Sequence, residues 1–192
     1  MPVSLQKGEN VSLSQTDPNL RAIVVGLGWN ARETEGASFD LDASVFMLNG
    51  TGKVRRDEDF IFYHNLTSMC SSVEHTGDEK SGGSGGDDES VKVYLDTVPE
   101  SVVKIAVTVT IHDADVRKQN FGQVEGAYIR IENMDTGIEI VRFDLAEDYG
   151  SETAIVFGEV YRNGSEWKFR AVGQGFAGGL ESLCRKYGVS LA

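Results

Sequence analysis

The chain has 192 residues, of which 30 are acidic and 18 are basic, so its formal net charge is −12. A surface of this sign repels phosphate groups, which argues against nucleic acid and anionic membranes as partners and favours cations. The two cysteines, Cys70 and Cys184, lie far apart in sequence and no apolar run is long enough to span a bilayer, so neither a disulfide framework nor membrane insertion is expected.

Period-two alternation of apolar and polar residues, rich in Val, Ile, Phe and Tyr, marks half-buried strands along the chain. In chain order the segments with this pattern are Val11–Ser14, Ala22–Trp29, Phe39–Leu48, Asp59–Tyr63, Val91–Leu95, Val103–Ile111, Ala127–Glu132, Glu139–Leu145, Ala154–Tyr161 and Trp167–Val172. Helical patterns are few: 115–119 predicts one turn and Leu180–Tyr187 predicts a short helix. Because many short strands are separated by turns such as Asn49-Gly50, we expect an all-β fold, a β-sandwich of about ten strands with a short C-terminal helix.

Two features resemble parts of an enzyme. The string Gly82-Gly83-Ser84-Gly85-Gly86 fits the nucleophile motif of hydrolases, but it lacks the strand before it and the helix after it that the motif requires. His112 with Asp113 forms a possible acid/base pair, although a histidine beside solvated carboxylates at a strand end is the more common explanation. We therefore expect no enzyme, and a hydrolase that uses Ser84, His112 or Asp113 is kept as an alternative.

Two groups of carboxylates are candidate cation sites. The first is Asp40-Leu41-Asp42, in which both carboxylates point to one side if the segment is extended. The second follows a glycine-rich stretch and places three carboxylates in a row, which repel one another unless they are exposed or neutralised. If the fold brings the two groups together, calcium fits them better than magnesium, because it accepts six to eight oxygen ligands in irregular geometry. The predicted ligands of about two calcium ions are Asp40, Asp42, Asn65, Asp87, Asp88 and Glu89.

A series of short strings runs in order from near residue 3 to near residue 189. They are Lys7–Leu13, Val25–Trp29, Phe39–Ser44, Asp59–Tyr63, His75–Asp78, Gly86–Glu89, Phe121–Val124, Phe157–Glu159 and Trp167–Phe176. Together they resemble the TerD family of tellurite-resistance and stress-response proteins. Within these strings, Asp40 and Asp42 match the family's Asp-x-Asp motif, and 86–89 matches its Gly-Asp-Asp-Glu motif.

The resemblance implies a single β-sandwich domain over residues 1–192, calcium binding through acidic loops and no established enzymatic activity. It also implies a role in tellurite resistance and stress response, through complexes with sister tellurite-resistance proteins at the inner membrane. The chain departs from the family at Asn30, where relatives commonly have Asp, so a ligating role at this position would weaken calcium affinity. The N-terminus lacks the basic-then-apolar pattern of a secretory signal, and we expect a cytoplasmic protein. A plain acidic scaffold without a metal-dependent role is the main alternative.

Overall fold

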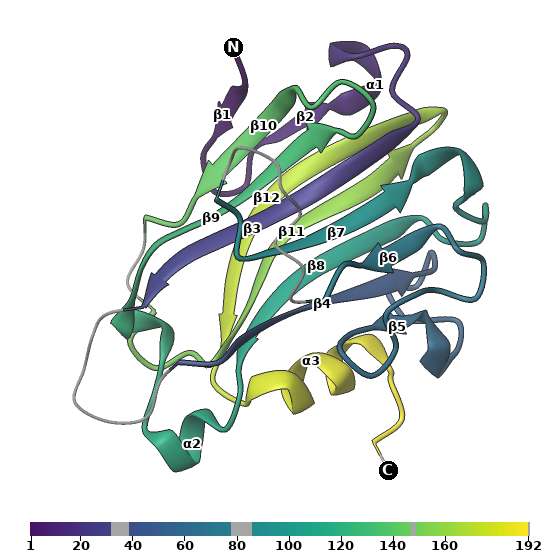
Figure 1. The fold of residues 1–192 in the computed structure, drawn as a ribbon. Coiled ribbons are helices and arrows are strands. Elements are labelled where there is room, and N and C mark those ends of the chain that lie inside the picture. The colour runs from purple at the N-terminus through teal and green to yellow at the C-terminus, as the bar shows by residue number, and fades with distance from the viewer. Residues whose placement is uncertain (32–38, 78–85, 147–148, 192) are drawn as a thin grey trace.

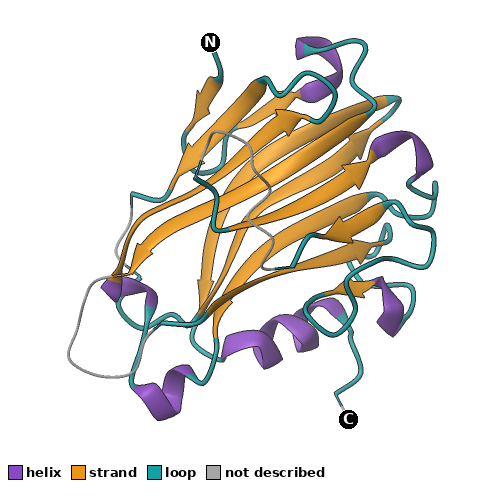
Figure 2. Cartoon of the chain, in the orientation of Figure 1, coloured by secondary structure: helices purple, strands orange, loops and turns teal. Residues whose placement is uncertain are grey.

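The computed structural model describes residues 1–31, 39–77, 86–146 and 149–191. In this part of the chain twelve strands form two six-stranded sheets that pack face to face (Figures 1 and 2). The first sheet has the spatial order β1 (Val3–Leu5), β10 (Glu139–Asp144), β9 (Val124–Asn133), β3 (Ala22–Ala31), β7 (Glu89–Tyr94) and β6 (Val73–His75). The second has the order β2 (Asn10–Ser12), β12 (Glu166–Phe176), β11 (Ala154–Asn163), β8 (Lys104–Ile111), β4 (Leu41–Leu48) and β5 (Phe60–Ile61).

The remaining elements are short and lie around the sheets. They are the helices α1 (Leu13–Thr16), α2 (Ala114–Arg117) and α3 (Gly179–Tyr187), and the 3-10 turns η1 (Asp57–Asp59), η2 (Leu95–Thr97) and η3 (Phe121–Gln123). No helix in the described ranges combines the length and the apolar character needed to cross a membrane. The predicted all-β sandwich with a short C-terminal helix is therefore confirmed.

Each of the ten predicted segments overlaps a strand, and the differences at the ends have local causes. The first segment was expected to remain extended to Ser14, but α1 begins at Leu13 because the side chain of Ser12 caps it by accepting the N–H of Gln15. Two strands were not predicted, β1 and β6, and each has only three residues. Strand β1 pairs in parallel with β10 at one edge of the first sheet.

Apolar residues alternate between two clusters along β4. Val45 and Met47 face the core between the sheets, whereas Phe46 and Leu48 face a second cluster that includes Leu183 of α3. The second sheet is therefore buried on both faces along this part of β4, and α3 forms a partial third layer over it (Figure 1). The start of β4 lies beside this layer, so its polar residues are placed near the N-terminal end of α3.

Candidate functional site

All the predicted ligands except Asn65 lie at one end of the sandwich, where β3 ends and where β4 and β7 begin (Figure 1). Asp40 and Asp42 lie at the start of β4, and the run 87–89 enters β7, which pairs with β3. Only Glu89 belongs to β7, and Asp87 and Asp88 lie in the irregular backbone before it, so the three side chains do not follow strand alternation. Each therefore has its own surroundings.

Asp87 lies on the outer face of the first sheet and is bound by Arg130 and Tyr128. The Nε and Nη2 atoms of Arg130 donate to the carboxylate at distances between 2.7 and 3.0 Å, and the Tyr128 hydroxyl donates to Oδ1 at 2.8 Å. The side chains of Asp87 and Arg130 are 8% and 11% exposed. The hydrogen bond to Asp87 raises the pKa of Arg130, and burial together with Asp87 raises the pKa of Tyr128 to about 12. The charge of Asp87 is therefore offset within the protein.

Glycine at position 26 makes this ion pair possible. A Cβ atom on Gly26 would lie 2.2 Å from Oδ2 of Asp87, so the carboxylate occupies the space above a residue that has no side chain. Gly28 has the same relation to Tyr128, whose ring a Cβ would meet at 2.3 Å. The Val-Gly-Leu-Gly-Trp string of β3 is thus explained by close packing of groups on the sheet surface.

Asp88 is exposed and is fixed through its backbone and one carboxylate oxygen. Its N–H donates to the carbonyl of Leu27 at 2.8 Å, and its Oδ2 accepts the N–H of Trp29 at 2.9 Å. Both partners belong to β3, the neighbouring strand. The side chain is therefore held at the surface where β7 begins.

Glu89 points inward and joins the two sheets. Its Oε2 accepts the N–H of Ala43 at 2.5 Å, and Nε2 of His75 donates to the carbonyl of the same residue at 3.1 Å. Nδ1 of His75 accepts the N–H of Gly77 at 2.9 Å, and its Nε2 lies 3.4 Å from Oε2 of Glu89. Strand β5 pairs with β4 at Val45 and Phe46. Beyond that pairing, the backbone of β4 at Ala43 hydrogen-bonds to the side chains of Glu89 and His75.

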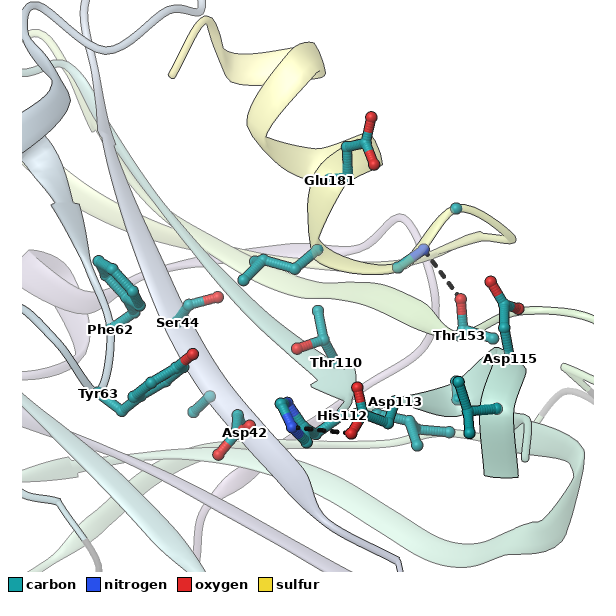
Figure 3. A pocket seen from close by; sticks show the side chains of 17 residues that line it. Asp42, Ser44, Phe62, Tyr63, Thr110, His112, Asp113, Asp115, Thr153 and Glu181 are labelled. Atoms are coloured by element: carbon teal, nitrogen blue, oxygen red, sulfur yellow. Dashed lines mark hydrogen bonds and ion pairs between the residues drawn. The ribbon is translucent and has the colours of Figure 1, made fainter. Parts of the chain in front are cut away.

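The other three predicted ligands have separate positions. Asp40 is exposed, and its carbonyl accepts the N–H of His112 at 2.8 Å. Asp42 is half-buried and faces a cavity of about 390 Å³ between β4 and α3 (Figure 3). Asn65 lies in the turn after β5, where its side-chain amide donates to the carbonyls of Glu58 and Phe60 at 3.2 and 2.8 Å.

These positions show which of the predicted ligands lie close to one another. Glu89 meets β4 at Ala43, next to Asp42, so the two acidic groups adjoin through the backbone. Among the described residues, no three His, Cys, Asp or Glu side chains are grouped so that they could hold a metal ion. A calcium ion would therefore find a partial fit: oxygen donors at Asp40 and Asp88 are exposed, whereas Asp87 and Glu89 are engaged by protein donors.

Sequence reasoning missed the residues that hold the acidic run, namely Tyr128, Arg130, His75 and the amides of Trp29 and Ala43. A weak signal existed for one of them, because Arg130 alternates with Ile129 and Ile131 and must face outward on a half-buried strand. The pairing of Gly26 with Arg130 across β3 and β9 depends on register, which no local pattern specifies.

The alternative acid/base group, His112 with Asp113, lines the same cavity and lies close to Asp42 (Figure 3). Nε2 of His112 is 3.2 Å from Oδ2 of Asp113, and the two side chains are 44% and 54% exposed. Ser44 also lines this cavity, and its hydroxyl is 2.7 Å from the hydroxyl of Thr108. Ser84, the other residue of that hypothesis, lies outside the described residues.

Comparison with known proteins shows similarity over the whole chain. The chain is 60% identical over 190 residues to tellurium resistance protein TerD of Serratia marcescens, covering 99% of each chain. It is 50% identical over 192 residues to general stress protein 16U of Bacillus subtilis strain 168, covering 100% of each. A solved structure of a homologue of telluride resistance protein (TerD) from Streptomyces coelicolor A3(2) has the same fold, with a TM-score of 0.66 and 20% identity over 91% of this chain and 100% of that chain. The family model for the TerD domain matches residues 1–187, and the chain therefore belongs to the TerD domain family.

Proposed function

We propose that the chain is a calcium-binding module of tellurium resistance and general stress response, which acts through protein partners and not by catalysis. The names of its relatives, a tellurium resistance protein and a general stress protein, support the biological role. The calcium-binding part is supported by the arrangement of Asp88 between two anchored neighbours.

The neighbours of Asp88 are anchored on opposite sides of the first sheet. Asp87 is bound to Arg130 on the outer face, and Glu89 is bound to the backbone of Ala43 toward the second sheet. Asp88 is therefore presented to solvent with little freedom, so little conformational entropy remains to be lost on binding a cation. A carboxylate has about four lone-pair sites, and the N–H of Trp29 uses one of those on Asp88.

Asp40 supplies a second exposed carboxylate at the same end of the sandwich. Its strand is tied to β7 by the hydrogen bond between Glu89 and Ala43. The segments 32–38 and 78–85, which adjoin Asp40 and Gly86 in the sequence, contain Glu33, Glu35, Asp78 and Glu79 and lie outside the described residues. In this proposal Asp40 and Asp88 contact calcium directly, Asp87 and Glu89 position the run, and about two ions are bound. Asp42 and Asn65 stay predicted ligands.

Calorimetric titration of the chelator-stripped protein with calcium tests the metal-binding part. We expect micromolar or tighter binding of calcium and weaker binding of magnesium, because magnesium retains more of its water. Asp88→Asn and Asp40→Asn should each weaken calcium binding at least about tenfold, since each removes a charged ligand. Glu100→Gln is the matched control: Glu100 is exposed and precedes β8, at the end of that strand remote from His112.

Two results would contradict this part of the proposal. The absence of calcium-dependent heat would leave the acidic scaffold as the better description. Equal loss of affinity in Glu100→Gln would show that calcium responds to overall charge and not to the placed carboxylates.

The biological role needs a cellular test. A bacterial strain that lacks its own TerD gene is complemented with this chain or with Asp88→Asn, and growth in tellurite is measured. We expect the chain to restore growth and the variant to restore less of it. We further propose a cytoplasmic location and assembly with sister tellurite-resistance proteins at the inner membrane. Cell fractionation and co-purification with those proteins check these two points, and restoration without co-purification would contradict action through partners.

A further inference from the structure

Two adjoining cavities form a groove along α3, on the outer side of the second sheet. One is the cavity of about 390 Å³ that Asp42 faces, and the other has a volume of about 590 Å³ and lies between β5, α3 and the C-terminal tail. They share Phe62, Leu180 and Glu181. We refer to this continuous depression as the α3 groove.

One end of the α3 groove is apolar. Phe60, Phe62, Leu180, Val189 and Leu191 line the larger cavity, and the side chain of Leu191 is 48% exposed. Exposed apolar residues also occur in the smaller cavity, where Tyr63 is 50% and Val116 is 84% exposed. Contiguous exposed apolar surface with polar edges is typical of a site of interaction with another molecule.

The other feature of the α3 groove is its negative charge. Carboxylates line it at Asp42, Asp57, Asp113, Asp115 and Glu181, whereas its cationic or titratable basic residues are Arg185 and His112. Arg185 pairs with Glu181, and His112 lies beside Asp113. Figure 3 shows Glu181 on α3, apart from Thr110, His112 and Asp113, with Tyr63 at one end of the view and Asp115 at the other. The carboxylates therefore surround the apolar surface and do not converge on one point.

This spacing favours one kind of ligand. A metal ion needs ligands at contact distance, and no three such side chains of the described residues are grouped in that way. Lysine and arginine carry their charge on long flexible stems and can reach separated carboxylates while neighbouring apolar side chains enter the cavities. We propose that the α3 groove binds a protein segment in which two or three apolar side chains are flanked by lysine or arginine.

This inference rests on the proposed function only in assuming a protein partner, and it does not require calcium. The groove includes Asp42 and Ala43 of β4, and Ala43 also holds Glu89, but Asp40 and Asp88, the proposed direct calcium ligands, lie outside its lining. Loss of calcium binding and loss of groove binding can therefore be observed separately.

Selection of random 16-residue peptides displayed on phage against the full chain tests the inference without assuming a sequence. Enriched peptides should combine apolar residues with lysine or arginine, and their affinity is then measured by fluorescence anisotropy on synthetic copies. We expect Tyr63→Ser and Leu191→Ser to weaken binding about tenfold, because each removes apolar surface from the groove. Glu181→Arg should weaken it about fivefold at low salt, with a smaller effect at high salt. All three residues are exposed, so the variants should fold.

Ile138→Ser and Glu100→Arg are the matched controls, because both residues are exposed and lie outside the groove. Peptides without basic residues, or binding that the controls weaken as much as Tyr63→Ser does, would overturn the inference. Self-association in analytical ultracentrifugation that Tyr63→Ser abolishes would assign the groove to a second copy of the chain and would overturn it equally. Calcium titration of Glu181→Arg serves as the separate check on the proposed function.

Discussion

The ion pair between Asp87 and Arg130 is the residue-scale feature with the clearest energetic consequence. Both side chains are almost fully shielded from solvent. Replacing Arg130 by Met should lower the free energy of unfolding by about 3 kcal/mol, because it leaves a buried carboxylate without its cationic partner. Urea denaturation measures the loss. The double variant Asp87→Asn with Arg130→Met should lose less, and a loss within about 0.5 kcal/mol for Arg130→Met alone would contradict the structure.

Gly26 leaves the space that the carboxylate of Asp87 occupies in this ion pair. In Gly26→Ala the new methyl group would overlap Oδ2 of Asp87, so either the carboxylate or the strand must shift. We expect a loss of about 1–3 kcal/mol in stability, as for overpacked sites. Gly50→Ala is the control, because nothing lies within 4 Å of the Cβ position there. Equal urea midpoints for the two variants would show that Asp87 is not held over Gly26.

Tyr128 gives this cluster a pH dependence at alkaline pH. Its pKa is raised to about 12 in the folded protein, from an ordinary value of 10.0. The folded state therefore keeps the proton that the unfolded state loses, and the stability contributed by this group is complete below pH 10 and is lost as the pH rises toward 12. Urea midpoints should fall less steeply over that interval in Tyr128→Phe than in the unmodified chain. If the urea midpoints of the two proteins fell equally steeply with pH, the result would argue against the contact between Tyr128 and Asp87.

At the scale of elements, the edge of β4 is completed by two side chains from the other sheet. Ala43 is buried, and its N–H and carbonyl contact Glu89 and His75. Glu89→Ala should destabilise the protein by about 1–3 kcal/mol, because it leaves a buried donor unsatisfied. Glu89→Gln retains an oxygen acceptor and should cost less. Slower hydrogen exchange at the Ala43 amide in Glu89→Gln than in Glu89→Ala would locate the destabilisation at the edge of β4. Equal exchange in the two variants would contradict a hydrogen bond from this amide to residue 89.

The same elements show how much of the fold the sequence could predict. The ten long or strongly alternating segments each overlap a strand, because period-two patterning follows directly from burial of one face. Strands β1 and β6 have three residues each; β2 and β5 are as short, but they overlap the longer apolar segments Val11–Ser14 and Asp59–Tyr63. The end of β2 at Ser12 depended on a capping hydrogen bond, which competes with the extended conformation.

The sequence identified two acidic runs but not the directions in which their side chains point. The runs Asp40–Asp42 and Asp87–Glu89 were recognised from composition, and the structure places both at one end of the sandwich. Whether Asp87 faces a metal ion or an arginine side chain depends on the register of β3 with β9. That register is fixed by contacts between residues far apart in sequence. The α3 groove likewise combines residues from β4, α2 and α3 that no local pattern joins.

At the scale of the whole molecule, the net charge of −12 makes the folded state sensitive to cations. Calcium at a hundredfold excess over its dissociation constant should stabilise the native state by about 2.7 kcal/mol per site. Thermal melts with calcium and with chelator measure this shift, with sodium chloride at matched ionic strength as the control for screening. Equal melting temperatures with calcium and with matched salt would show that only nonspecific screening acts.

The location of the calcium site is most directly tested by a ¹H–¹⁵N NMR titration of the chelator-stripped chain. We predict saturable shifts of the amides of Trp29, Asp88 and Glu89, and of Asp40 before β4, with Gly137 unchanged as an internal reference. Shifts restricted to the α3 groove, at residues such as Asp115 and Glu181, or no shifts at all, would contradict a calcium site where β4 and β7 begin.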